Sequence, residues 1–573
     1  MQSIALPKPW LKFYAEGIPQ TLEIPEEPLY SLLVGAATKY PDSTALDFMD
    51  KRISYKQLNE LSNQFANGLR SLGYKKGSKL ALILPNTPQF VFCFWGALKA
   101  GVTLVPCNPI YRERELEFQL RDSGAEGVVI LNNIIPPNDY YSEFEKARAR
   151  LPLIKQVFTT SITDFLPPLK KQLAGPVKKI GSIKRPDTID LVPFISRQSR
   201  SEPDQAPIRP GEDLAVLQYT GGTTGTSKGA MLTHHNLLTN SVILMHWTGG
   251  NQAGKMLGVT PFFHIYGLTV CMTSPTCRAM EIVLLPSFNV KEVLETIERK
   301  KITHFPGVST MYIAILNYPE LAKYSLKSIR TCVSGAAPLP LEVQKKFNSV
   351  TGGNLAEGYG LTEASPVTHS NPFGKGAIVK SGSIGIPIPD TDAKIVDSET
   401  GTKDLPMGEV GELAVKGPQV MKGYWNRPDE TANVLRDGWL LTGDIARMDE
   451  DGYFYIVDRK KDMIDASGFK VWPREVEEVL FSQPDIKEAA VVGVKDSYRG
   501  ETVKAFVVLK NKDKNPGVQA IQEYCKTQLA PYKVPKIIEF RDELPKSLVG
   551  KVLRRKLRES DNEKAPETST QTG

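Results

Sequence analysis

Between about residues 45 and 350, short apolar runs alternate with amphipathic segments of helical length. The run LALIL (80–84) precedes PQFVFCFWGALKAG, which is followed by TLVP (103–106) and later by GVVIL (127–131). A second round extends from LAVLQYT (214–220) to ITHFPGV (302–308). Parallel strands need a long crossover, usually a helix, so this alternation predicts βαβ units and parallel sheets covered by helices.

The chain has 573 residues, too many for one compact core. After Gly382 the pattern changes to short β-rich segments, and from about Met463 it becomes that of a compact α+β unit. We therefore predict an α/β protein with a large N-terminal domain (1–460) of two α/β subdomains plus a β-rich one. A small α+β C-terminal domain (461–560) should follow. The polar residues 561–573 are predicted to form a disordered tail.

The stretch from Pro152 to Pro210 is rich in Pro, Lys and Ser and shows poor periodicity. This composition predicts a surface insertion or long connection. Its lysines could touch anionic lipid, but a solvated loop is the simpler interpretation of a short charge run.

Charge and cysteine usage exclude several classes of protein. A formal net charge of +7 is small for this length and lacks the dense basic stripe of a nucleic-acid binder. The six cysteines form no C-x-x-C pair, which fits a reducing compartment and argues against zinc or disulfides. The most apolar stretch, Leu80 to Cys107, is interrupted by polar residues and prolines. We predict a cytoplasmic protein and leave peripheral membrane contact and a homodimer open.

The sharpest local signal is YTGGTTGTSKG (219–229), directly after the apolar run LAVLQ. Its glycines leave backbone N–H groups free to face an anion, while hydroxyls and a lysine add donors and positive charge. It is not a Walker A loop, because the lysine precedes the last glycine. We predict phosphate binding by Thr220, Gly221, Gly222, Thr223, Thr224, Gly225 and Lys228.

Six further segments follow in order: PFFHIYG (261–267), SGAAPL (334–339), EGYGLTE (357–363), TGD (442–444), DRKKDMI (458–464) and PKSLVGK (545–551). Together with the glycine-rich loop they resemble the signatures of the adenylate-forming superfamily. That superfamily includes acyl-CoA synthetases, luciferases and the adenylation domains of peptide synthetases. The resemblance covers about residues 30–558 and implies ATP, Mg²⁺ and coenzyme A as ligands.

The resemblance also implies a nucleotide site. Glu363 would hold Mg²⁺, which needs only one or two carboxylates beside phosphate oxygens and water, and Thr362 would contact the α-phosphate. Tyr359 would stack on adenine. The remaining nucleotide-binding positions that it implies are Gly335, Ala336, Glu357, Gly360, Asp444 and Arg459, with the last two on the ribose.

Chemistry explains why a cation is needed as well. A carboxylate must be joined to a good leaving group before a thiol can attack it, but the triphosphate of ATP repels the carboxylate. By resemblance, Lys551 would lie between the carboxylate and the α-phosphate during adenylation. His264 would lie near the carboxylate end of the acyl pocket.

Two half-reactions at one site imply a moving domain. In the superfamily the C-terminal domain rotates about a hinge, and Lys461 occupies the hinge position. The face around Gly468 would then replace Lys551 and admit the pantetheine arm, with Lys470 available to a phosphate of coenzyme A.

The acid is predicted to be a long- or medium-chain fatty acid. Leu268, Val270 and Met272 supply apolar lining candidates, and the chain most resembles long-chain fatty acyl-CoA synthetases. An aryl-acid–CoA ligase of the coumarate type and a fatty acyl-AMP ligase that loads a carrier protein remain alternatives. Lys470 and Trp472 depart from the subgroup's usual residues. A luciferase-type oxygenase and a non-catalytic scaffold are further alternatives, but a scaffold would be expected to have lost Lys551 or Glu363.

Overall fold

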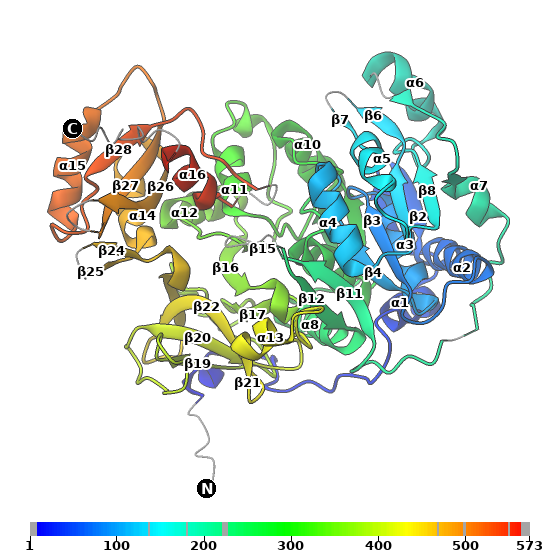
Figure 1. Cartoon of the computed structure of the whole chain (residues 1–573), viewed down its shortest axis with the longest axis horizontal. Helices are drawn as coiled ribbons and strands as arrows, with labels where there is room; N and C mark the ends of the chain where they lie inside the picture. The colour runs from blue at the N-terminus through cyan, green and yellow to red at the C-terminus, as the bar shows by residue number, and fades with distance from the viewer. Residues whose placement is uncertain are drawn as a thin grey trace, which may run out of the picture.

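The computed structural model describes residues 8–135, 138–178, 181–204, 206–220, 227–466, 469–496, 500–547 and 551–562. From blue to green, Figure 1 shows the two α/β parts, followed by a β-rich sheet in yellow and a small α+β domain in orange and red. This arrangement confirms the predicted fold class.

The first α/β part is built on a sheet with the strand order β10-β8-β5-β3-β4-β11-β12. Neighbouring strands run parallel except for the antiparallel pair β11 and β12, which flanks the glycine-rich loop. The strands are β3 (Lys79–Ile83), β4 (Thr103–Pro106), β5 (Gly127–Leu131), β8 (Gln156–Thr160), β10 (Ile189–Asp190), β11 (Leu214–Tyr219) and β12 (Gly229–Thr233).

Helices cover this sheet. In α3 (Pro88–Lys99) every residue is buried, which explains an apolar run with no polar face. Among the described residues, no helix is both long and apolar enough to cross a membrane. The other helices named in this part of the chain are α1 (Ser31–Lys39), α2 (Tyr55–Ser71), α4 (Glu113–Ser123), α5 (Ser142–Arg148) and α8 (His234–Trp247).

The interpretation of residues 152–210 as a surface insertion is wrong for part of that stretch. It contributes β8 and β10 to the main sheet, and β8 pairs in parallel with the interior strand β5. The run QVFTT is too short for its period to stand out among prolines and lysines. The rest of the stretch includes α6 (Pro168–Lys178) and α7 (Leu191–Ser196).

The second α/β part holds two four-stranded sheets, β2-β1-β14-β13 and β15-β16-β17-β18. Bridges from His304 to Met256 and to Thr331 join them edge to edge. The strands are β1 (Thr44–Phe48), β2 (Lys51–Ser54), β13 (Lys255–Gly258), β14 (Glu281–Leu284), β15 (Thr331–Ser334), β16 (Asn354–Gly360), β17 (Val367–Ser370) and β18 (Ile386–Pro387). Helices here are α10 (Val290–Lys300), α11 (Ser309–Leu316) and α12 (Leu341–Thr351).

The β-rich sheet is antiparallel and leads into the small domain. It contains β19 (Asp392–Val396), β20 (Gly411–Lys416), β21 (Leu435–Arg436), β22 (Trp439–Met448) and β23 (Phe454–Arg459). The short helix η5 (Lys460–Asp462) connects β23 to the next sheet. The predicted boundary at 460/461 falls in this connection and stays a prediction.

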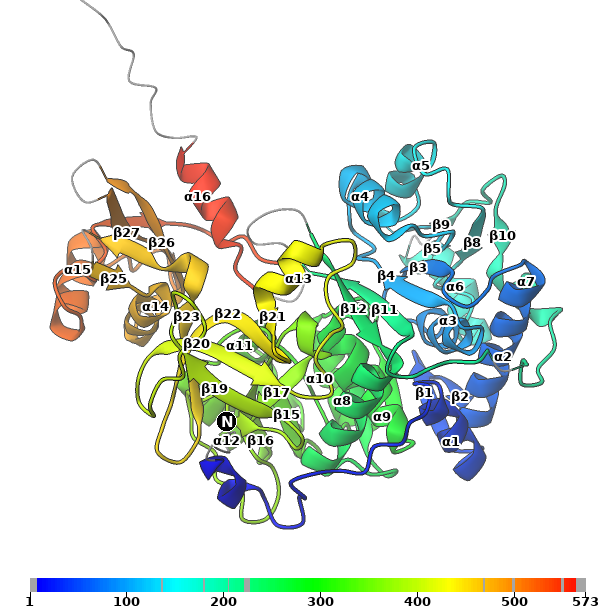
Figure 2. The same cartoon turned by 60° about the horizontal axis from the view of Figure 1, so that its bottom comes forward.

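The small domain packs its helices on one sheet, in the order β25-β24-β27-β26 with β28 beside β27. Figure 2 shows it beside the β-rich sheet, at the opposite end of the molecule from α2 and α7. Its elements are β24 (Ile464–Ala466), β25 (Phe469–Val471), α14 (Pro473–Ser482), β26 (Ile486–Asp496), β27 (Gly500–Leu509), α15 (Gly517–Gln528), β28 (Ile537–Phe540) and α16 (Arg554–Asn562). Helix α16 therefore includes the first residues of the segment predicted to be a tail.

Candidate active site

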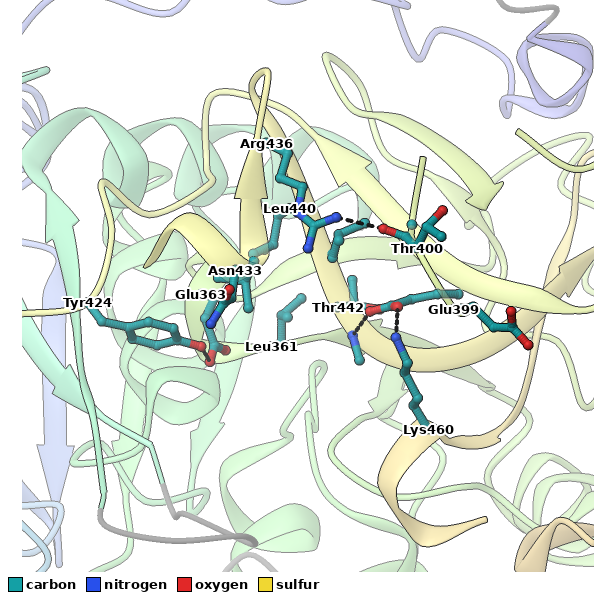
Figure 3. Close-up of a pocket in the computed structure, with 15 residues that line it drawn as sticks. Leu361, Glu363, Glu399, Thr400, Tyr424, Asn433, Arg436, Leu440, Thr442 and Lys460 are labelled. Atoms are coloured by element: carbon teal, nitrogen blue, oxygen red, sulfur yellow. Dashed lines mark hydrogen bonds and ion pairs between the residues drawn. The ribbon is translucent and has the colours of Figure 1, made fainter. Parts of the chain in front are cut away.

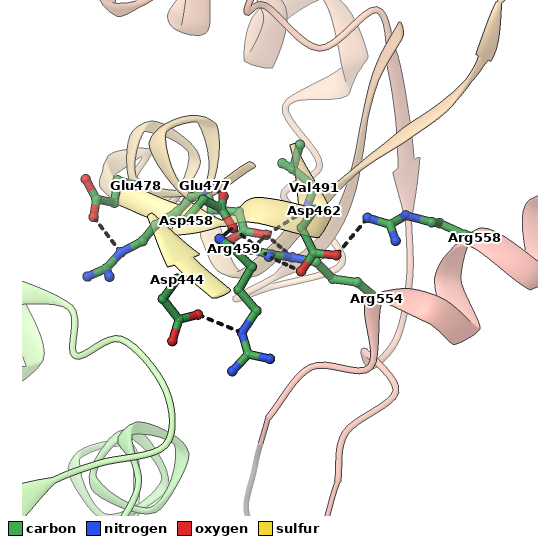
Figure 4. A network of polar contacts seen from close by, with 10 residues as sticks. Asp444, Asp458, Arg459, Asp462, Glu477, Glu478, Val491, Arg554 and Arg558 are labelled. Carbon is green, nitrogen blue, oxygen red and sulfur yellow. Dashed lines mark hydrogen bonds and ion pairs between the residues drawn. The ribbon is translucent and has the colours of Figure 1, made fainter. Parts of the chain in front are cut away.

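Two facing strands supply the best-defined part of the site. Asp444 on β22 lies opposite Arg459 on β23, and the Arg459 Nε lies 3.2 Å from Asp444 Oδ1 (Figure 4). The Tyr359 hydroxyl, at the end of β16, donates a hydrogen bond of 2.6 Å to the other oxygen, Oδ2. The charge of Asp444 raises the pKa of Arg459. Three residues predicted to hold the nucleoside thus contact one another.

Lys551 joins this group from the small domain. Burial lowers the pKa of its ammonium to about 7, assisted by the charges of Arg459 and Lys461 and opposed by Asp444. These interactions require the ammonium to lie within electrostatic reach of the Asp444–Arg459 pair. Its backbone is held by Ser547, whose hydroxyl accepts from the Lys551 N–H at 3.2 Å.

His264 also lies within electrostatic reach of the Lys551 ammonium. Burial, with the Lys551 charge as a second cause, lowers the pKa of His264 to about 4. The imidazole is therefore neutral near pH 7, and its Nδ1 accepts the Tyr266 backbone N–H at 3.3 Å. A neutral ring with Nδ1 occupied suits a hydrogen-bond donor through Nε2 better than a general base.

The carboxylate of Glu363 is held by a residue that sequence reasoning missed. Glu363 lies in the short helix η4 (Thr362–Ala364), and its Oε1 accepts a 2.6 Å hydrogen bond from the Tyr424 hydroxyl. Tyr424 lies 61 residues after the end of the nearest quoted motif on its N-terminal side, so no local pattern marks it.

Glu363 and Tyr424 line a polar cavity of about 260 Å³ (Figure 3). Glu412 and Lys460 form an ion pair of 2.9 Å in its wall, and the Gly443 N–H donates to Glu412 at 2.9 Å. No cluster of three or more metal-ligating side chains occurs within the described ranges. A single carboxylate fits Mg²⁺ that arrives with a triphosphate and keeps its water ligands.

Lys228 lies near Tyr424, the residue that binds the Glu363 carboxylate. It forms an ion pair with Glu430, and its Nζ lies 5.1 Å from the centre of the Tyr424 ring. The Thr220 N–H donates to the Lys228 carbonyl at 2.9 Å, which closes the base of the predicted phosphate loop. Gly221, Gly222, Thr223, Thr224 and Gly225 lie outside the described residues.

Close packing explains two of the predicted small residues. A Cβ at Gly360 would come within 2.2 Å of the Pro366 carbonyl oxygen, and one at Gly335 within 3.1 Å of the Tyr266 ring. Ala336 has a φ of 65°, a left-handed conformation that few side chains adopt. The packing around Gly335 and Gly360 therefore leaves little room for a larger side chain.

Glu357 is buried, and burial raises the pKa of its carboxyl to about 7 although Arg474 opposes the shift. The Arg474 guanidinium, at the start of α14, lies 3.9 Å from Glu357 Oε1. This charge pair links the small domain to β16. Sequence reasoning placed Glu357 in the nucleotide site but did not find Arg474.

Of the residues predicted for the hinge and for coenzyme A, Lys461 borders this centre, since its charge acts on the Lys551 ammonium. Lys461 belongs to η5, and partial desolvation with the Arg459 charge lowers its pKa to about 8. Lys470 is exposed on β25. Gly468 lies outside the described residues.

A small apolar crevice of about 20 Å³ lies between α8, the helix η2 (Gly267–Thr273) and β15. Val270, one of the predicted pocket residues, lines it together with Met245 and Met256. Leu268 and Met272 are buried nearby in the core. Because methionine is unbranched and flexible, this crevice can widen through side-chain rotation.

Comparison with known proteins places this geometry in a family. Residues 33–425 match the family described as AMP-binding enzyme, and residues 475–551 match the AMP-binding enzyme C-terminal domain. A long-chain-fatty-acid–CoA ligase of Bacillus subtilis is 48% identical over 97% of this chain and 98% of its own. One from Escherichia coli is 40% identical over 96% of this chain and 98% of its own.

Solved structures of other CoA ligases and synthetases superpose on this chain. An anthranilate CoA ligase in complex with anthranoyl-AMP superposes with a TM-score of 0.84 at 27% identity, over 94% of this chain and 98% of that one. A Mycobacterium tuberculosis fatty acyl CoA synthetase superposes with a TM-score of 0.71 at 28% identity, over 94% and 99%. The chain therefore belongs to the AMP-binding enzyme family.

Proposed function

We propose that the protein is a fatty-acid–CoA ligase for long- or medium-chain acids. It forms an acyl-adenylate from the acid and ATP, then transfers the acyl group to coenzyme A. The observation that carries this proposal is the position of Lys551, which lies within reach of the Asp444–Arg459 pair and of His264. The names of the relatives at 40–48% identity support a long-chain fatty acid as the substrate.

In the first half-reaction a carboxylate oxygen attacks the α-phosphorus of ATP. The bond from that phosphorus to the bridging oxygen breaks, and pyrophosphate leaves with the electron pair. Asp444 holds the ribose hydroxyls, while Tyr359 packs against the base. Protonated Lys551 screens the repulsion between the carboxylate and the α-phosphate, and so stabilises the charge that develops between them.

Thr362 and Glu363 face the phosphates from η4. Mg²⁺, held by Glu363 and by phosphate oxygens, would supply charge neutralisation for the leaving pyrophosphate. Tyr424 fixes the orientation of the Glu363 carboxylate through its hydroxyl. Lys228, Thr220 and the loop that they close would bind the outer phosphates.

In the second half-reaction the sulfur of coenzyme A attacks the acyl carbonyl carbon. The thiol proton is lost to solvent, the bond from the carbonyl carbon to the phosphate oxygen breaks, and AMP leaves. The domain 461–560 rotates about Lys461 between the two steps, which withdraws Lys551 and brings Gly468 and Lys470 to the site. The connection η5 is short and lies between two sheets, as a hinge requires.

The alkyl chain would enter the crevice beside Val270. Its closed volume of about 20 Å³ is far too small for a fatty acid, so Met245 and Met256 must move as the chain enters. The polar side chain of His264 would lie at the carboxylate end of the acyl chain.

The acid is supplied from the cytoplasm or from a membrane surface. Helix α6 exposes Leu169 and Leu173, one turn apart and 68% and 47% accessible, beside Lys170 and Lys171. This composition suits peripheral contact with anionic lipid. Co-sedimentation with vesicles containing phosphatidylglycerol, compared with phosphatidylcholine alone, would measure it.

The function is tested by acid-dependent AMP release with Mg·ATP, with and without coenzyme A. The panel extends from acetate to oleate and includes benzoate and coumarate. Release that requires coenzyme A and is fastest with a long or medium alkyl acid supports the proposal. A maximum on an aryl acid would contradict the choice of substrate. An adenylate that coenzyme A does not consume would indicate transfer to a carrier protein instead.

A further inference from the structure

A buried cluster of charges lies where the small domain meets the β-rich sheet (Figure 4). We call Arg554 with its three carboxylate partners, Asp458, Asp462 and Glu477, the Arg554 cluster. The Arg554 Nη1 lies 3.1 Å from Asp458 Oδ1 and 3.2 Å from Asp462 Oδ2, while its Nη2 lies 2.7 Å from Glu477 Oε2. One guanidinium therefore binds three carboxylates at once.

The members of the cluster come from different parts of the chain. Asp458 belongs to β23, on the N-terminal side of the predicted hinge at Lys461. Arg554 and Glu477 belong to α16 and α14 of the small domain. The contact between Arg554 and Asp458 therefore crosses the hinge, whereas the contact between Arg554 and Glu477 stays within the small domain.

Asp458 is held almost entirely from the small-domain side. Its side chain is 2% exposed, and its second oxygen accepts the Arg474 backbone N–H at 2.6 Å. Burial alone would lower the pKa of Arg554, but Glu477, Asp458 and Asp462 together raise it. The guanidinium therefore stays charged, and its charge is matched inside the protein.

The cluster is joined to Lys551 by very little chain. Only Val552 and Leu553 separate the two basic residues. Val552 forms a β-bridge with Lys546, and the Leu553 N–H donates to the Pro545 carbonyl at 2.8 Å. Asp458 is likewise the immediate neighbour of Arg459, which lies near the Lys551 ammonium. Arg554 thus contacts Asp458, while Lys551, three residues earlier, lies near Arg459, the next residue after Asp458.

We propose that Arg554 is a positioning residue for acyl-adenylate formation: by holding Asp458 across the hinge, it sets the Lys551 ammonium beside the Asp444–Arg459 pair. This inference rests on the proposed function. It gives Arg554 no contact with substrate. Its effect is to restrict where the start of α16 lies relative to β23, and therefore where Lys551 lies relative to the nucleotide.

The cluster also suits a reversible contact. When the small domain rotates, Arg554 keeps Glu477 and Asp462, so its charge is never left unpaired. Asp458 loses Arg554 and the Arg474 N–H together but keeps the N–H of Arg459, which donates to its Oδ1 at 2.7 Å. An unpaired buried charge would be costly. Within the cluster, this division leaves Asp458 as the one carboxylate that loses contacts on opening; outside the cluster, Glu357 loses Arg474.

The test separates the two half-reactions in the full-length protein. Arg554→Lys and Asp458→Asn are compared with Arg555→Gln, a matched control at an exposed neighbour paired with Glu559. Palmitate-dependent exchange of radiolabelled pyrophosphate into ATP reports adenylation. Single-turnover consumption of preformed palmitoyl-AMP by coenzyme A reports thioester formation. Nucleotide affinity is measured by equilibrium binding.

We expect a loss of roughly 10–100-fold in exchange for the two cluster variants, since a displacement of about 1 Å can cost about 100-fold. Thioester formation and nucleotide affinity should stay within about twofold of the wild type, and the control should match the wild type throughout. Equal losses in both half-reactions, or no loss, would overturn the inference. If Asp458→Asn fails to fold, Arg554→Lys still decides, because it keeps a positive charge against Glu477.

The same experiment separates this inference from the function on which it rests. Wild-type protein that shows no palmitate-dependent exchange would refute the proposed function itself. Wild-type protein that exchanges, with cluster variants that exchange equally well, would refute only the role of Arg554.

Discussion

At the scale of single residues, the protonation state of Lys551 sets the direction of the pH dependence. In the proposed mechanism adenylation needs the charged ammonium, and burial lowers its pKa to about 7. The charged form is therefore lost as the pH rises through that value. We expect kcat/KM for adenylation in the free enzyme to fall above about pH 7, as measured by pyrophosphate exchange between pH 6 and 9.

Lys551→Arg tests the cause, because a guanidinium stays protonated over this range. The variant should be slower at its best pH but should lack the alkaline decline. An unchanged alkaline decline in Lys551→Arg would assign the titration to another group. Lys551→Ala should nearly abolish adenylation and leave the consumption of preformed acyl-AMP largely intact.

Asp444 gives a second prediction at the same scale. Asp444→Asn removes the negative charge that Arg459 faces and weakens the acceptor proposed for the ribose. Hydrogen bonds to charged groups contribute about 1.5–3 kcal/mol, so we expect KM for ATP to rise roughly 10- to 100-fold. Asp437→Asn, at an exposed position before the same strand, should leave KM unchanged. Steady-state kinetics with ATP as the varied substrate measures both.

At the scale of elements, the start of α2 makes a prediction about stability alone. Ser54 forms a capping box with Gln57, in which the Ser54 hydroxyl accepts the Gln57 N–H and the Gln57 side chain accepts the Ser54 N–H. Ser54→Ala should lower the free energy of unfolding by about 1 kcal/mol. Denaturant unfolding measures it, and Thr38→Ala, on the exposed side of α1, should have little effect. Adenylation by folded protein should not change.

The elements also show which features of the fold could be predicted from the sequence. Apolar periodicity predicted the parallel sheets. The glycine-rich segment predicted to bind phosphate falls between β11 and β12, and residues 221–226 of it lie outside the described ranges. Contacts such as the one between Arg554 and Asp458 join residues 96 positions apart, and Tyr424 meets Glu363 across 61 positions. No local pattern encodes such pairs, because they form only when separate sheets pack together. The strand β8 was missed for a different reason, since five residues among prolines carry too little periodicity.

At the scale of the whole molecule, the two half-reactions should depend differently on the hinge. Lys461→Pro fixes φ near −65° at the second position of η5. Proline is tolerated there because an N–H in the first turn of a helix has no partner within the helix. We expect adenylation to remain within a few fold of the wild type and thioester formation to fall steeply, because rotation is restricted. Lys461→Ala, which leaves the backbone free, is the control. Loss of adenylation in the proline variant alone would contradict a hinge at this position.

The domain arrangement has an optical consequence. Of the six tryptophans in the chain, only Trp472 follows Lys461. It is half-buried directly before α14, the helix whose first turn meets Asp458 and Glu357. If the small domain rotates as proposed, this indole would change its emission each time those contacts break. Stopped-flow fluorescence of the unlabelled enzyme, with Trp472→Phe as the silent reference, could therefore time the rotation directly and show whether it or the chemistry limits turnover.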